Sequence, residues 1–291
     1  MRILITGATG FIGTSLIGRF LRERDVHDVL CCVRDIENAR LKLGIHRNIK
    51  YCSLSNSETI KDFNPEIVVH LAAFNTSKEG LAEIHSLVES NIEYGLMLLN
   101  ILTGCDKFKI FINTGSFSQF CNGGDAYLYS ASKSAFETFL KYYSKRYGWK
   151  YINVVPYTVY GGEKTVKRLI DYIIESLDSS RPIAMSKGEQ ELDFIHVEDV
   201  ASFYISAIRN YDLIESGQTF HIGTGISTSI REVSYLIEDI TGKKCNINWG
   251  GINYRDNDIM YAIAPKQEIR DSIWNPKFNL REGLTEYLLH D

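Results

Sequence analysis

One tyrosine and one lysine stand at a spacing that suits proton transfer. Tyr129 and Lys133 lie four residues apart within the run DAYLYSASKSAFETFLKYYSKRYG. If this run forms a helix, both side chains lie on one face, about one turn apart. A tyrosine hydroxyl has a pKa of about 10, and a neighbouring cation lowers it by favouring the phenolate. The pair could therefore act as a general acid or base, although a solvated helix face could carry the same pair by chance.

Small hydroxyl residues precede this run. Thr114, Ser116 and Ser118 come directly after the apolar stretch 109–113, which is typical of a buried strand. Ligands of open α/β sheets bind beyond the carboxyl ends of the strands, so these hydroxyls are placed to meet a substrate. A turn alone would also explain small hydroxyl residues. Their position just ahead of the tyrosine–lysine pair favours the catalytic interpretation.

The N-terminal residues form a pattern that binds dinucleotides. A short apolar run, 2–6, leads into Gly7, Gly10 and Gly13, and helical periodicity follows in 14–21. Strand, glycine turn and helix in this order are the context that such a motif requires. The first two glycines let backbone N–H groups approach a pyrophosphate at the helix N-terminus, and the third lets the helix pack closely on the sheet. A plain tight turn is the alternative. We expect cofactor contacts from Gly7, Thr9, Gly10, Phe11, Ile12 and Gly13.

The end of the second expected strand, 28–33, bears on the choice of cofactor. Arg34 and Asp35 follow it directly. An acidic residue at this place accepts hydrogen bonds from the ribose diol of NAD, whereas an arginine pairs with the extra phosphate of NADP. Because Arg34 comes first, the sequence favours NADP(H), and Asp35 leaves NAD(H) possible.

Other apolar stretches extend the expected cofactor site. The continuous apolar run 66–73 is typical of a strand buried on both faces, and its small carboxyl-terminal residues leave room for a ligand. We expect His70, inside this run, to be a core histidine rather than a ligand. Asn91 interrupts the helical pattern 81–102 and could hold a helix kink or a water molecule near the site. Further expected cofactor contacts are Leu54, Leu71, Ala72, Ala73 and Asn91.

The composition is that of an ordinary globular protein. The 291 residues are 44% hydrophobic and 23% charged, with a net charge of −4, which argues against nucleic acid or an anionic membrane as the main partner. We find neither a signal-peptide pattern nor a run of about 18 apolar residues. Six cysteines lack metal-ligand spacing, so we expect reduced thiols, no metal site and a cytoplasmic protein.

Several ordered motifs together give a resemblance to a known family. They are Gly7-x-x-Gly10-x-x-Gly13, His70-Leu71-Ala72-Ala73, Asn91, Ser116, Tyr129-x-x-x-Lys133, Val159-Tyr160-Gly161, the run 188–200 (GEQELDFIHVEDV) and the run 220–225 (FHIGTG). Over nearly its whole length the chain resembles the extended short-chain dehydrogenases/reductases that act on nucleotide sugars.

The resemblance implies an α/β fold with a Rossmann-type, doubly wound parallel sheet and a smaller C-terminal α/β substrate-binding domain. It assigns residues 1–161 to an NAD(P)-binding domain, to which residues 193–210 return. Residues 162–192 and 211–291 would form the nucleotide-sugar-binding domain. Helices around 82–103 and 127–147 are the faces that this group pairs into a homodimer, although an amphipathic helix is equally consistent with a monomer.

A narrower likeness points to one branch of the family. The runs 255–260 (RDNDIM), 274–278 (WNPKF) and 113–117 (NTGSF) are similar to those of the CDP-abequose and CDP-paratose synthases and related dTDP-sugar reductases. That branch reduces the 4-keto group of a nucleotide-linked 6-deoxy or 3,6-dideoxy hexulose with NADPH. The likeness therefore implies a CDP- or dTDP-linked substrate and a deoxysugar nucleotide, made for surface polysaccharide, as the product.

The resemblance also implies roles for individual residues. Tyr129 would protonate the developing alkoxide, Lys133 would lower the pKa of that tyrosine and hold the nicotinamide ribose, and Ser116 would hydrogen-bond the ketone oxygen. Pro156 would lie near the nicotinamide. The expected substrate contacts are Thr114, Ser116, Thr158, Lys167, Arg168 and Arg255.

Two positions depart from the group. Val155 and Leu192 stand where the group often has arginines, the second of which commonly helps to hold the substrate diphosphate. Its absence is why Arg255, Lys167 and Arg168 become the candidates for binding that diphosphate.

Other reactions and roles remain as alternatives. A dehydratase carries an Asp-Glu pair next to the Ser/Thr, and Phe117-Ser118 at those places argue against it. A 4-epimerase uses the same serine, tyrosine and lysine with a retained NAD, so these residues leave it open. A non-catalytic, cofactor-sensing protein on this fold would usually lose the tyrosine or the lysine, and both are present here.

Overall fold

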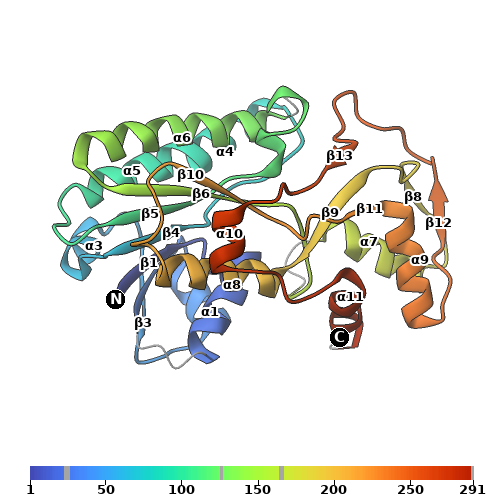
Figure 1. Ribbon diagram of the computed structural model, residues 1–291, viewed down its shortest axis with the longest axis horizontal. Helices are drawn as coiled ribbons and strands as arrows, with labels where there is room; N and C mark the ends of the chain where they lie inside the picture. Colours follow the sequence, from blue (N-terminus) through green and yellow to red (C-terminus); the bar gives the residue numbers. More distant parts are fainter. Residues whose placement is uncertain (23–26, 125–126, 164–166, 290–291) are drawn as a thin grey trace.

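The computed structural model describes residues 1–22, 27–124, 127–163 and 167–289. They form a larger part, in which helices flank a central parallel sheet, and a smaller part at the other end of the molecule (Figure 1). None of the helices in the described ranges has the length and apolar composition needed to cross a membrane.

The larger part is organised around a seven-stranded sheet with the strand order β10-β6-β5-β4-β1-β2-β3, and every pairing in it is parallel. Burial explains its sequence pattern, because strands covered on both faces read as continuous apolar runs. Its strands are β1 (Arg2–Thr6), β2 (Asp28–Cys32), β3 (Ile49–Cys52), β4 (Ile67–His70), β5 (Ile110–Thr114), β6 (Lys150–Pro156) and β10 (Gln218–Ile222).

Helices cover both faces of this sheet. On one face α1 (Phe11–Arg22), α2 (Ile36–Leu43) and α8 (Val197–Arg209) bury their apolar sides. The other face carries α3 (Ser57–Phe63), α4 (Leu81–Val88), α5 (Tyr94–Leu102) and the long α6 (Leu128–Tyr147) (Figure 1). This doubly wound arrangement confirms the fold class expected from the sequence.

The smaller part consists of short strands and helices. In its main sheet β9 pairs with β7, β11 and β13, and a separate ribbon pairs β8 with β12. Its strands are β7 (Thr158–Tyr160), β8 (Ile183–Met185), β9 (Glu191–His196), β11 (Ser227–Ser229), β12 (Ile247–Trp249) and β13 (Tyr261–Ala262). Its helices are α7 (Leu169–Ser176), α9 (Ile230–Thr241) and α11 (Leu280–Leu289), whereas α10 (Glu268–Ile273) packs on the larger part, against α8 and β10.

The chain passes between the two parts more often than the sequence indicates. The resemblance assigns 211–291 to the smaller part, whereas β10 completes the large sheet beside β6 and Trp274 packs in the core of the larger part. Within 193–210, α8 packs on the same side of the large sheet as α1, whereas residues 193–196 belong to β9 of the smaller part.

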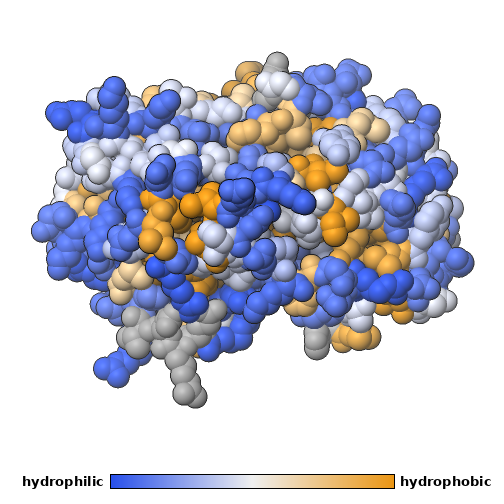
Figure 2. Space-filling model, viewed as in Figure 1, coloured by the Kyte–Doolittle hydropathy of each residue, from blue (hydrophilic) through white to orange (hydrophobic). Residues whose placement is uncertain are grey.

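Apolar residues gather between the two parts. Figure 2 shows that much of the face seen in Figure 1 is hydrophilic, with separate apolar groups, one of them at the junction of the larger and smaller parts. The carboxyl ends of β4, β5 and β6 face this junction, which is where open α/β sheets bind their ligands.

A short π-helix, η1 (Glu89–Glu93), joins α4 to α5. Asn91 lies in the middle of it and is buried. Its side-chain oxygen accepts a hydrogen bond from the backbone N–H of Phe74 at 2.7 Å, and its amide donates to the Phe74 carbonyl at 3.0 Å and to Ser132 Oγ at 2.9 Å. Asn91 therefore holds a helix irregularity in place, which is one of the two roles considered from the sequence.

Candidate active site

The glycine turn between β1 and α1 forms a cradle that no side chain could fill. Gly7 has φ +68°, and a Cβ atom there would lie 2.6 Å from the backbone nitrogen of Ala72. A Cβ atom at Gly13 would lie 2.2 Å from the carbonyl oxygen of Gly7. The first turn of α1 carries no acidic residue, so the positive end of the helix dipole is left for an anion. These residues fit a dinucleotide pyrophosphate.

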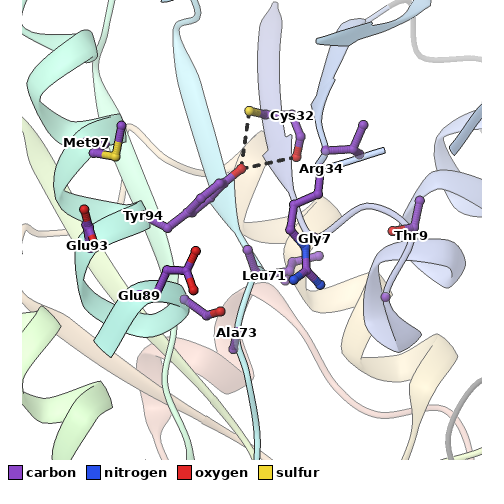
Figure 3. Close-up of a pocket in the computed structure, with 14 residues that line it drawn as sticks. Gly7, Thr9, Cys32, Arg34, Leu71, Ala73, Glu89, Glu93, Tyr94 and Met97 are labelled. Carbon is purple, nitrogen blue, oxygen red and sulfur yellow. Dashed lines mark hydrogen bonds between the residues drawn. The ribbon is translucent and has the colours of Figure 1, made fainter. Parts of the chain in front are cut away.

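A cavity of about 330 Å³ lies beside this turn. Figure 3 shows Tyr94 of α5 reaching towards Cys32, with Glu89, Glu93 and Met97 on the same helical segment and with Arg34 and Thr9 on the opposite side. Seven residues that we expected at the cofactor line the cavity: Gly7, Thr9, Gly10, Arg34, Leu71, Ala72 and Ala73.

One wall of this cavity is a helical segment whose residues were not predicted from the sequence to lie at the cofactor. Glu89, Ser90, Glu93, Tyr94 and Met97 all line it. The Tyr94 hydroxyl donates a hydrogen bond to Cys32 Sγ at 3.3 Å, which connects this helical segment to β2 of the sheet. The interruption of the helical pattern at Asn91 is the only signal that could have pointed to this segment.

Arg34 and Asp35 differ in position. Arg34 is exposed and lines the cavity. Asp35 caps the N-terminus of α2 instead, where its carboxylate accepts a hydrogen bond from the backbone N–H of Asn38 at 3.0 Å. Of these two neighbours, the arginine is therefore the one placed to meet a group bound in the cavity.

Other expected cofactor residues do not line this cavity, among them Gly13 and Asn91. Leu54 is packed in the core beneath it, Ile12 packs against the core from α1, and Pro156 is buried at the end of β6. Phe11 lies at the wall of a separate cavity of about 270 Å³. His70 is only 1% exposed, its Nδ1 lies 2.8 Å from Thr6 Oγ1, and burial lowers its pKa to about 3. It is the core histidine that the sequence predicted.

Tyr129 and Lys133 both lie in the first two turns of α6. Tyr129 lines a large cavity of about 640 Å³ at the junction of the two parts, and Ser116 lines the same cavity from the end of β5. Lys133 is only 3% exposed, and its Nζ donates a hydrogen bond to the Thr114 carbonyl at 2.9 Å. The same Nζ lies 5.8 Å from the centre of the Tyr129 ring. The fold thus brings the three expected catalytic residues to one place.

The electrostatics of this pair differ from the expectation. Burial raises the pKa of Tyr129 to about 12, because removal from water disfavours the phenolate. Burial likewise lowers the pKa of Lys133 from 10.5 to about 8. The lysine was expected to lower the pKa of the tyrosine, but in this structure desolvation dominates. At neutral pH Tyr129 therefore keeps its proton and is a neutral phenol.

The expected substrate residues separate into two groups. Lys167, Arg168 and Arg255 line the large cavity. Thr158 lines the smaller cavity beside Phe11, and its Oγ1 is buried without a hydrogen-bond partner. Thr114 lines neither, because its hydroxyl lies 2.7 Å from that of Tyr204 inside the protein.

Arg168 lies where the two cavities meet. It lines both of them, and its guanidinium carbon stands 3.3 Å from the centre of the Phe11 ring. Stacking on an aromatic face holds a guanidinium flat. Leu192, at the place of the arginine that the family usually has, lines the large cavity as an apolar residue.

A carboxylate in the large cavity was not expected from the sequence. Asp258 lines it and accepts a hydrogen bond from the Tyr127 hydroxyl at 3.3 Å and from the Gln190 amide at 3.4 Å. It stands three residues after Arg255 in the run RDNDIM, which is the signal that could have found it. In the described part of the chain no group of three or more His, Cys, Asp or Glu side chains could hold a metal ion.

Comparison with known proteins places this geometry in context. The family model described as "NAD dependent epimerase/dehydratase family" matches residues 3–223. A CDP-abequose synthase of Yersinia pseudotuberculosis is 26% identical over 293 residues, with 98% of each chain covered. A dTDP-4-dehydro-6-deoxyglucose reductase of Escherichia coli is also 26% identical, with 98% of this chain and 96% of the relative covered.

A solved structure agrees with the fold. UDP-glucuronic acid 4-epimerase of Bacillus cereus, determined with UDP-glucuronic acid and NAD, superposes with a TM-score of 0.86, covering 100% of this chain and 99% of the other. At 21% identity this similarity bears on the fold alone.

Proposed function

The chain is an enzyme of the NAD dependent epimerase/dehydratase family, and we propose that it reduces the 4-keto group of a nucleotide-linked 6-deoxy or 3,6-dideoxy hexulose. One observation carries the proposal: Tyr129, as a neutral phenol, and Ser116 line one cavity, and no carboxylate pair follows Ser116. Phe117 and the buried Ser118 occupy those places. Reduction needs a proton donor and a ketone-binding donor, and the cavity offers both.

We propose a role for each of these residues. A dihydronicotinamide cofactor bound along the glycine turn would supply the hydride. Ser116 donates a hydrogen bond to the ketone oxygen, and Tyr129 delivers its hydroxyl proton to the same oxygen as negative charge develops on it. Lys133, fixed by the Thr114 carbonyl, keeps a positive charge near the phenolate that Tyr129 becomes. Hydride and proton together convert the ketone to an alcohol.

NADP(H) is the cofactor that we propose. The support is that Arg34 lines the cavity beside the glycine turn, while the carboxylate of Asp35 is engaged in capping α2. An arginine pairs with the 2′-phosphate through charge-assisted hydrogen bonds. The two acidic residues at the cavity wall, Glu89 and Glu93, belong to the opposite segment.

For the substrate we propose a CDP- or dTDP-linked sugar, as the relatives' names indicate. Arg168, Lys167 and Arg255 all line the cavity and would bind the diphosphate in place of the arginine that Leu192 replaces. The unpaired hydroxyl of Thr158 would bind a polar group of the sugar nucleotide. The product would be a deoxysugar nucleotide of the kind used in surface polysaccharides.

The test is to incubate the protein with CDP-, dTDP- and UDP-4-keto-6-deoxyhexoses and NADPH, and to follow the loss of nicotinamide absorbance. We expect oxidation with a CDP- or dTDP-linked ketone. If no ketone oxidises NADPH but a 4-hydroxy sugar nucleotide interconverts with its C4 epimer, the protein is a 4-epimerase, since the same three residues serve that reaction.

A further inference from the structure

Three serine hydroxyls connect the buried side of α6 to the large cavity. Ser130 Oγ donates a hydrogen bond to Ser118 Oγ at 2.8 Å, and Ser118 Oγ lies 2.9 Å from Ser116 Oγ. Ser130 is fully buried and Ser118 is 4% exposed, and the cavity lining includes Ser116 and, deeper in its wall, Ser118. The row thus runs from the protein interior to the place where a substrate ketone would bind.

The direction of the hydrogen bonds follows from counting hydrogens. Each hydroxyl carries one hydrogen and can accept others. Because Ser130 uses its hydrogen on Ser118, the hydrogen of Ser118 is left to go to Ser116. The reverse arrangement, with Ser116 donating to Ser118, would leave the hydrogen of Ser118, a residue only 4% exposed, without a protein acceptor, which is unfavourable. The hydrogen of Ser116 is therefore free to point into the cavity.

The turn that carries Ser116 is fixed to the same helix. The side-chain oxygen of Gln119 accepts a hydrogen bond from the backbone N–H of Ser116 at 2.8 Å, and its amide donates to Ser134 Oγ at 3.2 Å. Ser130 and Ser134 stand one turn apart on α6 and so lie on one side of it. Two serines of the helix that bears Tyr129 thus hold the turn that bears Ser116.

We propose that Ser118 and Ser130 are positioning residues that direct the Ser116 hydroxyl hydrogen towards the substrate ketone. The inference rests on the proposed ketone reduction and names residues beyond it. A hydrogen bond received from Ser118 also polarises the Ser116 hydroxyl and makes it a stronger donor, because hydrogen bonds in a row strengthen one another. An ionised carboxylate at position 118 would only accept, and it would turn the Ser116 hydrogen away from the ketone.

A double-mutant cycle tests whether Ser118 acts through Ser116. Loss of a direct oxyanion donor, as in Ser116→Ala, lowers kcat by about 10²–10³-fold. We expect Ser118→Ala to lower kcat by roughly 10-fold, a fraction of that loss, with little change in KM for the nucleotide sugar. In the Ser116→Ala background Ser118→Ala should have no further effect, and Ser130→Ala should behave in the same way.

Conservative and matched variants complete the cycle. Ser118→Thr keeps the hydroxyl and should retain most of kcat. Ser144→Ala removes another buried hydroxyl of α6, one that donates to the Trp149 carbonyl, and should leave kcat unchanged. If the kcat losses of Ser116→Ala and Ser118→Ala multiply, or if Ser118→Ala changes only KM, the proposal is overturned.

Neutron diffraction on deuterated wild-type crystals decides the same question without turnover. A deuteron of Ser118 on the line to Ser116 Oγ, with that of Ser116 directed into the cavity, supports the proposal. A deuteron of Ser116 directed at Ser118 overturns it. A wild type that turns over no ketone refutes the proposed reaction instead, and the neutron result still decides the orientation of Ser116.

Discussion

Buried charge decides the chemistry of the tyrosine–lysine pair. From the sequence, the spacing of Tyr129 and Lys133 predicts that they share a helix face, and they do so in α6. The sign of their pKa shifts could not be predicted, because it depends on how much surrounding protein removes water from each group. Burial raises the pKa of Tyr129 and lowers that of Lys133, so the tyrosine carries its proton at neutral pH.

We expect the buried ammonium of Lys133 to lower the stability of the protein. Its pKa falls from 10.5 to about 8, so below pH 8 the folded state holds an ammonium that it disfavours. Lys133→Met should therefore raise the free energy of unfolding by about 2 kcal/mol at pH 7 and abolish turnover. Urea unfolding measures this difference.

The pH dependence has a definite sign. Between about pH 8 and pH 10.5 the unfolded chain binds the lysine proton and the folded chain does not, so wild-type stability gains with rising pH. The advantage of Lys133→Met should therefore shrink from pH 7 to pH 9.5. A variant less stable than wild type at both pH values would contradict this account.

Arg34 offers a test of the cofactor. If it pairs with the 2′-phosphate, Arg34→Ala removes a charge-assisted bond and should raise KM for NADPH by about 10–100-fold. KM for NADH should change little. Arg40→Ala is the matched control, because that exposed arginine of α2 pairs with Glu37 at 2.8 Å. Steady-state kinetics with NADPH and NADH measure both KM values. An equal rise of KM for the two cofactors would exclude a phosphate-binding role for Arg34.

At the scale of elements, periodicity predicted most helices and strands of the larger part, because a buried parallel sheet imposes continuous apolar runs. The π-helix η1 could not be predicted in detail, since Asn91 is held by the distant backbone of Phe74. Likewise the position of β10 in the large sheet could not be predicted, because it depends on pairing with β6, which is distant in the sequence. Contacts distant in sequence set both features.

The close packing of α5 on α6 gives an element-scale prediction. A Cβ atom at Gly95 would lie 2.3 Å from the Phe136 ring, so Gly95→Ala should push the helices apart and destabilise the protein by about 1–3 kcal/mol. Gly18→Ala in α1 is the matched control. Its Cβ atom would meet only the flexible Arg22 side chain at 3.4 Å.

Thermal unfolding of the two variants compares them directly. Gly18→Ala should stabilise the protein by up to about 1 kcal/mol, because alanine favours a helix interior. A Gly95→Ala variant as stable as wild type would mean that α5 and α6 can separate at no cost.

For the whole molecule, the sequence indicated two interleaved parts but not how often the chain crosses between them. The number of crossings depends on the pairing of β10 with β6 and on the packing of Trp274. Neither contact leaves a strong local pattern in the sequence. The cavity at the junction depends on both parts, since Tyr129 comes from the larger part and Arg255 from the region of the smaller one.

We propose that the protein is a homodimer through α4 and α6, which lie on one face of the sheet (Figure 1). Val88 of α4 and Phe139 of α6 are exposed apolar residues. Val88→Arg combined with Phe139→Arg should convert the dimer to a monomer, because unpaired charges disfavour an apolar interface. Leu41→Arg is the control. It changes an exposed leucine of α2, on the opposite face of the sheet, and should leave the dimer intact.

Light scattering coupled to size-exclusion chromatography measures the molar mass of these variants. A wild type that already has the mass of one chain would refute the dimer. A double variant that keeps the mass of two chains would show that the interface lies elsewhere.

The central claim is that Tyr129 protonates a sugar ketone while a nicotinamide cofactor reduces it. The most direct measurement supplies NADPH deuterated at the transferred position with a CDP- or dTDP-4-keto-6-deoxyhexose, and locates the deuterium by mass spectrometry and NMR. We predict one NADPH oxidised per sugar and one deuterium at C4 of the product, with Tyr129→Phe slowing turnover by about 10²–10⁴-fold while still binding NADPH. Conversion of a 4-hydroxy sugar to its epimer with no deuterium gained and no NADPH consumed would contradict the claim.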